Sequence, residues 1–148
     1  MTFQFRMDQV LDYKHNQKEM VQKEFAEHQE KFEEIGMALY ELLKKKETIQ
    51  LQQSERIVGG EQVRTIQHYG FYIDTMEKEA HSLQHRLHIA RDNMEDAKGR
   101  LLEKTIDVKK YEKLKEKQHE RYREDLKQQE ARYMDELVVI RHTNHEIR

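Results

Sequence analysis

The sequence contains no cysteine and no proline, and only five of its 148 residues are glycine. Without cysteine the chain can form neither a disulfide bond nor a thiolate metal site, which suits a reducing compartment such as the cytoplasm. Without proline it lacks the residue that breaks helices most strongly. These absences favour long helices joined by few loops.

Hydrophobic residues are also scarce, at 36% of the chain against 38% for charged residues. A globular domain is about 45–50% apolar and about 25% charged, so this composition favours either disorder or extended helix. The 27 basic and 29 acidic residues nearly cancel, which gives no reason to expect a nucleic acid or an anionic membrane as partner. The longest aliphatic run is Leu137 to Ile140, so we expect no membrane insertion and a cytoplasmic protein.

A heptad pattern decides between disorder and helix. From Ile66 to Tyr111 apolar residues recur at alternating spacings of three and four, and 13 of the 14 positions on this line are apolar. Such a line stays on one side of a supercoiled helix and must face another helix. A second line runs from Met7 to Ile49, with nine of its 13 positions apolar. The sequence therefore predicts two amphipathic helices.

Gly59 and Gly60 separate the two lines. Paired glycines suit the left-handed cap that ends a helix, and two long amphipathic segments around a short breaker usually fold back on each other rather than form one hinged helix. We predict an all-α fold in which two long helices form an antiparallel coiled-coil hairpin, the second helix longer than the first. The chain is then a single coiled-coil domain, 1–148, with bounds of about 4–53 for the first helix, 54–62 for the turn, 63–141 for the second helix and 142–148 for a tail.

The register of this hairpin has two solutions. Partner residues have numbers that add to a constant, and the heptad phase allows sums of 115 or 122. The second sum places Phe25 opposite Ala97 and Phe32 opposite Ala90, so that a ring fills the space that a small residue leaves. We therefore favour 122.

The second helix is expected to extend beyond the first at its C-terminal end. Met7 would face Val108 or Lys115, so the residues from Lys115 to Arg148 have no partner in the first helix. Whether this overhang is helical, folded back or dimerising stays open at this stage. It carries a shifted apolar stripe made of Leu126, Tyr133, Leu137 and Ile140.

Titratable residues form no catalytic constellation. The spacing of His81, His85 and His88 would allow two imidazoles to bind Zn²⁺, but they occupy outward positions with no fixed carboxylate or cysteine to complete the shell. We therefore expect no metal, no cofactor and no enzymatic activity. Lys98 to Arg123 is rich in lysine and arginine with interleaved glutamate, which is typical of a solvated face with ion pairs three and four residues apart.

The apolar line of each helix forms one half of the seam between the two helices. An aromatic pair, Phe71 and Tyr72, cannot be buried in this seam together with Tyr69 and Ile73. One interpretation is a docking patch near the end of a helix. The other is a local cluster in which the pair folds over residues 57–58 of the loop. Both interpretations stay open at this stage.

Three segments together suggest a family. The chain opens with an aromatic pair, an arginine, an apolar pair and a basic residue, namely Phe3, Phe5, Arg6, Val10, Leu11 and Lys14. The dense apolar start is expected to dock rather than hang free. The second helix begins with Tyr69, Tyr72, Ile73, Met76, Glu77 and Lys78, and near the C-terminus an acidic pair precedes an apolar residue, namely Asp135, Glu136 and Leu137. On a chain of this length and hairpin pattern, these segments resemble the FliJ family of bacterial flagellar type III export.

The resemblance implies a general export chaperone or escort, and a stalk-like coiled coil that couples the export ATPase ring to the export gate during flagellum assembly for motility and chemotaxis. The implied partners are a FliI-like ATPase hexamer, the cytoplasmic domain of an FlhA-like gate protein and other export chaperones. The implied location is the cytoplasm, peripherally at the inner membrane of the flagellar base. The alternative is a generic coiled-coil scaffold or adaptor that dimerises through its C-terminal overhang.

The same resemblance implies two sets of site residues. The gate-binding patch would consist of Tyr69, Tyr72, Met76 and Leu83. The end that faces the ATPase ring would consist of Phe3, Phe5, Arg6, Lys110, Lys113, Lys117, Arg121 and Arg123.

Overall fold

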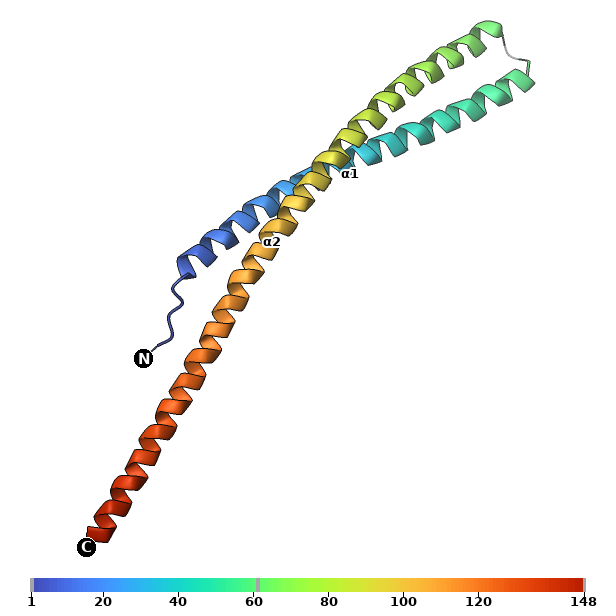
Figure 1. Ribbon diagram of the computed structural model, residues 1–148. Coiled ribbons are helices and arrows are strands. Elements are labelled where there is room, and N and C mark those ends of the chain that lie inside the picture. The colour runs from blue at the N-terminus through green and yellow to red at the C-terminus, as the bar shows by residue number, and fades with distance from the viewer. Residues whose placement is uncertain (1, 61, 148) are drawn as a thin grey trace. The chain divides into compact units, whose positions relative to one another are not determined.

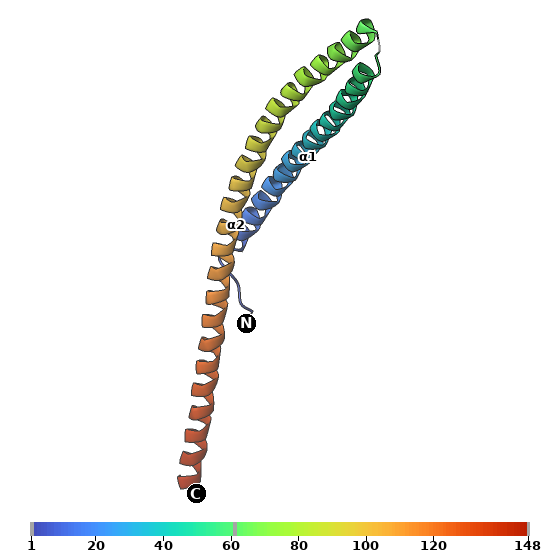
Figure 2. The ribbon, with the colours of Figure 1, turned by 90° about the vertical axis from the view of Figure 1, so that its right-hand side faces the viewer.

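Two α-helices account for most of the chain in its computed structural model, which describes residues 2–60 and 62–147. Helix α1 spans Asp8–Val58, and α2 spans Val63–Ile147. They run antiparallel and pack against each other (Figure 1 and Figure 2). The predicted all-α hairpin is confirmed, and α2 is the longer helix, with 85 residues against 51.

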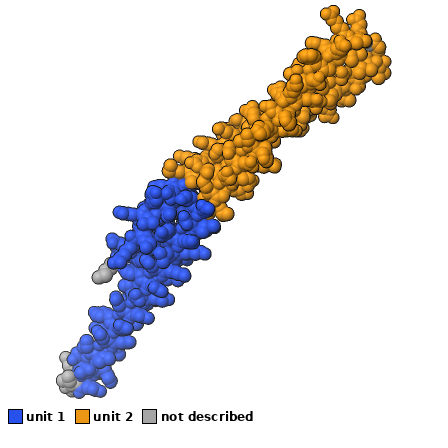
Figure 3. Space-filling model, turned by 45° about the horizontal axis from the view of Figure 1, so that its top comes forward, with its two compact units in different colours: residues 1–18, 103–148 blue, residues 19–102 orange. Residues whose placement is uncertain are grey.

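Both helices are divided between two compact units (Figure 3). Unit 1 contains Met1–Lys18 and Glu103–Arg148, so it joins the start of α1 to the C-terminal part of α2. Unit 2 is Glu19–Leu102 and contains the turn. That the whole chain is one domain stays a prediction. Neither helix, over the residues that the structure describes, has a segment both long and apolar enough to cross a membrane.

The turn is shorter than the predicted 54–62. No glycine or proline lies between Gly36 and Gly59. The Gly59 N–H donates to the carbonyl of Glu55 at 2.9 Å, which continues the helical pattern. Gly60 then adopts a φ of 78° and donates to the carbonyl of Ile57 at 3.3 Å. This is the hydrogen bond of a glycine-terminated helix, and it explains why α1 ends at Val58.

The other helix ends also differ from prediction. The predicted first helix began near residue 4, whereas α1 begins at Asp8. The predicted second helix ended near residue 141, whereas α2 continues to Ile147 through residues that include no glycine or proline. Met1, Glu61 and Arg148, which belong to the predicted docking segment, turn and tail, lie outside the described residues.

Residues 2–7, here named the N-terminal strap, are not helical. Phe5 is only 5% exposed, and the Phe3 ring lies 4.9 Å from the His119 ring and 5.6 Å from the Tyr122 ring, measured between centroids. Residues two apart share a side in an extended chain but lie about 200° apart around a helix. An extended strap therefore lets both phenylalanines be covered. Met7, predicted to lie on the seam, instead precedes α1 and is 43% exposed.

The buried side chains follow the predicted heptad lines. In unit 2 the core consists of Leu39, Ile73, Met76, Ala80, Ala90 and Ala97. In unit 1 it consists of Phe5, Leu11 and Val108. Ala97 is fully buried, as expected where a small residue of α2 faces a larger residue of α1.

Contacts between the helices agree with a register near 122. In unit 2, Lys46 Nζ lies 3.3 Å from Glu77 Oε1, and the Arg91 guanidinium lies 5.9 Å from the centroid of the Phe32 ring. The residue numbers of each pair add to 123. In unit 1, Lys115 Nζ donates to Asp8 Oδ1 at 2.9 Å, and these numbers also add to 123. The sum of 115 would instead place residue 46 opposite residue 69.

Replacing Gly60 with alanine should destabilise the hairpin by about 1–2 kcal/mol, because a left-handed φ of 78° strains a residue with a Cβ. Urea unfolding followed by helical circular dichroism measures this loss. Gly99→Ala is the control, because a Cβ at this helical position meets no atom within 4 Å. It should instead stabilise the protein by about 0.5–1 kcal/mol. Equal losses in the two variants would contradict the assigned cap.

Phe5→Ala should release the strap, since burial of one phenylalanine contributes about 1.5–3 kcal/mol. The amides of residues 8–11 should then exchange with solvent at least about tenfold faster. Hydrogen exchange followed by mass spectrometry detects this change. Val10→Ala, at a position that is 40% exposed, serves as the control and should have little effect. Unchanged exchange in Phe5→Ala would show that the phenylalanine does not hold the strap.

Candidate functional site

The four residues of the predicted gate-binding patch lie on α2 in unit 2 and differ in exposure. Tyr72 is 44% exposed, Tyr69 and Leu83 are half-buried, and Met76 is only 4% exposed. Met76 therefore belongs to the core beneath the patch. The surface that a partner can reach consists of the two tyrosines and the edge of Leu83.

Helix α1 adds cations to this patch, which sequence reasoning missed. Lys45 Nζ lies 5.7 Å from the centroid of the Tyr72 ring, and the Arg56 guanidinium lies 5.4 Å from that of Tyr69. Both distances are within the range of cation–π attraction. The favoured register gave only an approximate signal, because a sum of 122 places Lys45 opposite residue 77 and Arg56 opposite residue 66, which lie five and three residues from the tyrosines. The result is an aromatic surface with a cationic border, here named the aromatic patch.

Phe71 does not join a local cluster over the turn. It is 78% exposed, while Ile57 and Val58 are 52% and 88% exposed. The interpretation in which the aromatic pair folds over the loop is therefore wrong. On α1, Met37 and Tyr40 are a further exposed pair, at 60% and 58%, three residues apart on one side of the helix. Sequence reasoning did not select them.

The three N-terminal residues of the predicted ring-facing end do not form one surface. Phe5 is buried and Phe3 is half-buried against α2, while Arg6 is exposed. While the strap is docked, Arg6 is open to a partner, whereas Phe3 is only partly accessible and Phe5 is covered. The phenylalanines hold the strap in place.

The five cations predicted for the same end are all exposed on α2 in unit 1. Four of them recur at helical spacings of three and four, so they share one stripe of the helix surface. This cationic stripe consists of Lys110, Lys113, Lys117 and Arg121. Arg123 lies on another side of the helix, beside Glu120 and Glu124.

The cationic stripe also differs from the side of α2 that faces α1. On that side Lys14 Nζ lies 3.7 Å from Asp107 Oδ2, and Lys115 pairs with Asp8. Within the described residues, none of the five predicted cations forms an ion pair with a carboxylate. The ion pairs expected three and four residues apart are therefore not formed here. The stripe remains available to an anionic partner.

The face of α2 that the strap covers continues beyond the strap. Tyr122, which the Phe3 ring contacts, is followed at heptad spacing by an uncovered apolar stripe. Its members Leu126, Tyr133, Leu137 and Ile140 are 37%, 63%, 39% and 55% exposed. The overhang is therefore helical and not folded back onto itself. No segment among the described residues covers this stripe.

The histidines do not assemble into a metal centre. His81, His85 and His88 are exposed, and His88 Nε2 lies 3.6 Å from Asp92 Oδ2. Across residues 2–60 and 62–147, no group of three histidine, aspartate or glutamate side chains could hold a metal ion.

Comparisons with known proteins identify the family of this chain. Residues 3–146 match a protein-family model described as Flagellar FliJ protein. A curated relative, the Flagellar FliJ protein of Bacillus subtilis (strain 168), is 29% identical over 139 residues, which cover 94% of this chain and 95% of the relative. No solved structure gives a significant match. Because the family match extends over nearly the whole chain, the protein belongs to the FliJ family of flagellar proteins.

Proposed function

We propose that this protein is a general export chaperone or escort of the flagellar type III apparatus, and that it couples the export ATPase ring to the export gate as a stalk-like coiled coil. Its family supports a role in flagellar export. The observation that carries the finer proposal is the exposed surface that each unit leaves outside the seam. Unit 2 displays the aromatic patch, and unit 1 displays the cationic stripe and the apolar stripe.

The aromatic patch is the proposed contact for the cytoplasmic domain of an FlhA-like gate protein. Tyrosine and arginine are enriched among the residues that contribute most to protein–protein binding. Tyr69 and Tyr72 offer broad apolar surface with a polar end, and Arg56 and Lys45 offer charge at its border. Met76 supports the tyrosines from the core and does not itself contact the gate protein.

The exposed surfaces of unit 1 are the proposed contact for a FliI-like ATPase hexamer. The cationic stripe supplies long-range attraction to an acidic surface and so speeds the encounter. The apolar stripe from Leu126 to Ile140 supplies area that can be buried after the encounter. Arg6 adds one more exposed cation, while Phe3 and Phe5 fix the strap beside it.

The proposed role requires no catalysis by this chain. It acts in the cytoplasm at the inner face of the membrane below the flagellum, where it also meets other export chaperones. A second candidate is a scaffold or adaptor that dimerises through the overhang, which the exposure of Tyr133 and Ile140 favours. Light scattering separates the two, because the scaffold would be a dimer at micromolar concentration without any other protein.

Tyr72→Ala should weaken binding to the cytoplasmic domain of the gate protein by about tenfold, the effect of losing one central aromatic contact. Calorimetry with purified proteins measures the affinity, and spreading in soft agar measures motility. Phe71→Ala is the matched control, since Phe71 is an exposed aromatic outside the aromatic patch. If Tyr72→Ala combined with Met76→Ala leaves both affinity and motility intact, the assignment of this patch is wrong.

Lys113→Glu combined with Lys117→Glu should lower the affinity for the ATPase hexamer at least about fivefold, because two attractive charges become repulsive. The wild-type affinity should itself fall as salt rises, since salt screens exposed charges. Surface plasmon resonance over a salt series measures both effects. Lys78→Glu combined with Lys98→Glu makes the same change of charge in unit 2 and should have little effect. Equal losses in the two double variants would mean that net charge, and not the stripe, governs binding.

A further inference from the structure

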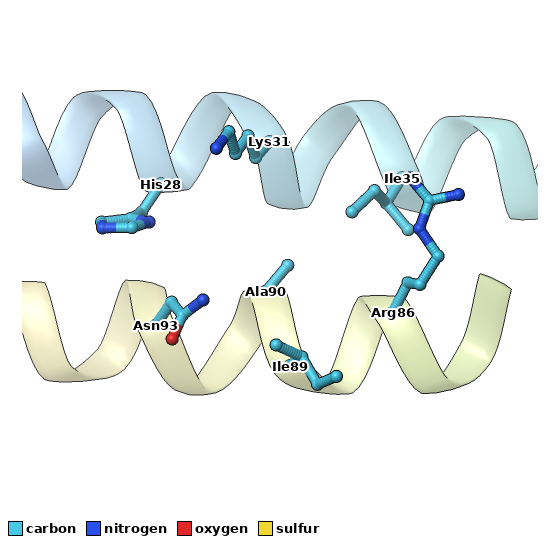
Figure 4. Close-up of a pocket in the computed structure, with 7 residues that line it drawn as sticks. All are labelled: His28, Lys31, Ile35, Arg86, Ile89, Ala90 and Asn93. Atoms are coloured by element: carbon cyan, nitrogen blue, oxygen red, sulfur yellow. The ribbon is translucent and has the colours of Figure 1, made fainter. Parts of the chain in front are cut away.

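A hollow of about 220 Å³ opens beside the seam in unit 2. Its floor is Ala90, which is only 8% exposed, and Ile35 of α1 points toward it across the gap between the helices (Figure 4). Ile89, which is 47% exposed, forms the outer wall. The hollow exists because a methyl group occupies a seam position where a larger side chain would fill the space.

The polar side chains around the hollow include two cations and no carboxylate. Lys31 and His28 come from α1, and Arg86 and Asn93 come from α2 (Figure 4). No carboxylate lines the hollow, although the chain as a whole has 29 acidic residues against 27 basic ones. Within the described residues, Lys31 and Arg86 form no ion pair. The hollow is therefore an apolar depression bordered by unpaired cations and an amide donor.

The size of the hollow indicates what can occupy it. Sites for drug-sized molecules measure about 300–1,000 Å³, which is larger than this hollow. An apolar cavity of about 150 Å³ holds a benzene ring. One large apolar side chain of a partner therefore fits into the hollow. Because the hollow is open to solvent, the partner's backbone can remain outside it.

We propose that this hollow is a docking point for a separate protein that presents an acidic amphipathic helix. One leucine-sized side chain enters over Ile35 and Ala90, and carboxylates one helical turn to either side reach Lys31 and Arg86. Asn93 donates a hydrogen bond at the end of the hollow. The hollow shares no residue with the aromatic patch or the cationic stripe, so the inference does not depend on the proposed function.

The test uses the full-length protein and a fluorescent helical peptide as probe. The probe carries one leucine, with glutamates three and four residues before and after it. Two matched peptides replace either the glutamates with glutamines or the leucine with alanine. We expect fluorescence anisotropy to show saturable binding of the probe, and each matched peptide to bind at least about fivefold more weakly.

Variants then locate the binding. Lys31→Glu combined with Arg86→Glu should weaken probe binding at least about tenfold, because both contacts become repulsive. Both side chains are exposed, so the fold should survive, which circular dichroism verifies. Lys98→Glu, an exposed cation elsewhere on α2, should leave binding unchanged.

If the probe binds, two outcomes would still overturn the proposal. One is probe binding that the double variant leaves unchanged, which would place the peptide elsewhere. The other is displacement of the probe by a peptide of residues 131–142 of this chain, in which Asp135 and Glu136 lie among apolar residues. The occupant would then be a second copy and not a separate protein. Failure of the probe to bind would also reject the hollow, and would leave the aromatic patch and cationic stripe unaffected.

Discussion

The structure depends on the packing of larger α1 side chains over small α2 side chains. The chain is 38% charged, and helices in proteins gain most of their stability from an apolar face packed against a partner. In unit 2, Ala80 and Ala97 of α2 are buried, and Phe32 lies on the α1 side of the seam, with its ring centroid 5.9 Å from the Arg91 guanidinium. The register fixes which residues become surface, and thereby fixes the candidate sites.

Most of the fold could be predicted because each of the two heptad lines can be buried within the chain only against the other. The chain also has no proline and few glycines to interrupt its helices. The pattern gave two helices, the fold-back at the glycines and the preferred register. It failed at the N-terminal strap, because heptad analysis assumes a helix and placed Met7 on the seam. The two-residue spacing of Phe3 and Phe5 was the available signal for an extended segment. The heptad pattern also predicted an end of α1 that is too early, because a helix can continue where the heptad spacing of apolar residues is lost, provided that no glycine or proline interrupts it.

The candidate sites were less accessible from the sequence. Tyr72 was identified correctly as an outward aromatic, but Met76 proved to be core, and the cations that border the aromatic patch come from the other helix. A line along one helix cannot reveal neighbours contributed by another without a fixed register. The hollow was still harder to foresee, because the pairing of Phe32 with Ala90 predicted filled space there. Ala90 instead lines the hollow, Phe32 is not among the lining residues, and the bordering charges come from both helices. Sequence patterns record side chains, not the gaps between them.

Disulfide trapping tests the register most directly, since the natural chain has no cysteine to interfere. A Cβ at Gly36 would lie 3.7 Å from Leu87 Cδ1, so Gly36→Cys with Leu87→Cys should form an intramolecular disulfide under mild oxidation. The alternative sum of 115 would instead pair residue 36 with residue 79. If Gly36→Cys with Glu79→Cys forms the bond readily while the first pair stays reduced, the register and the surfaces derived from it are wrong.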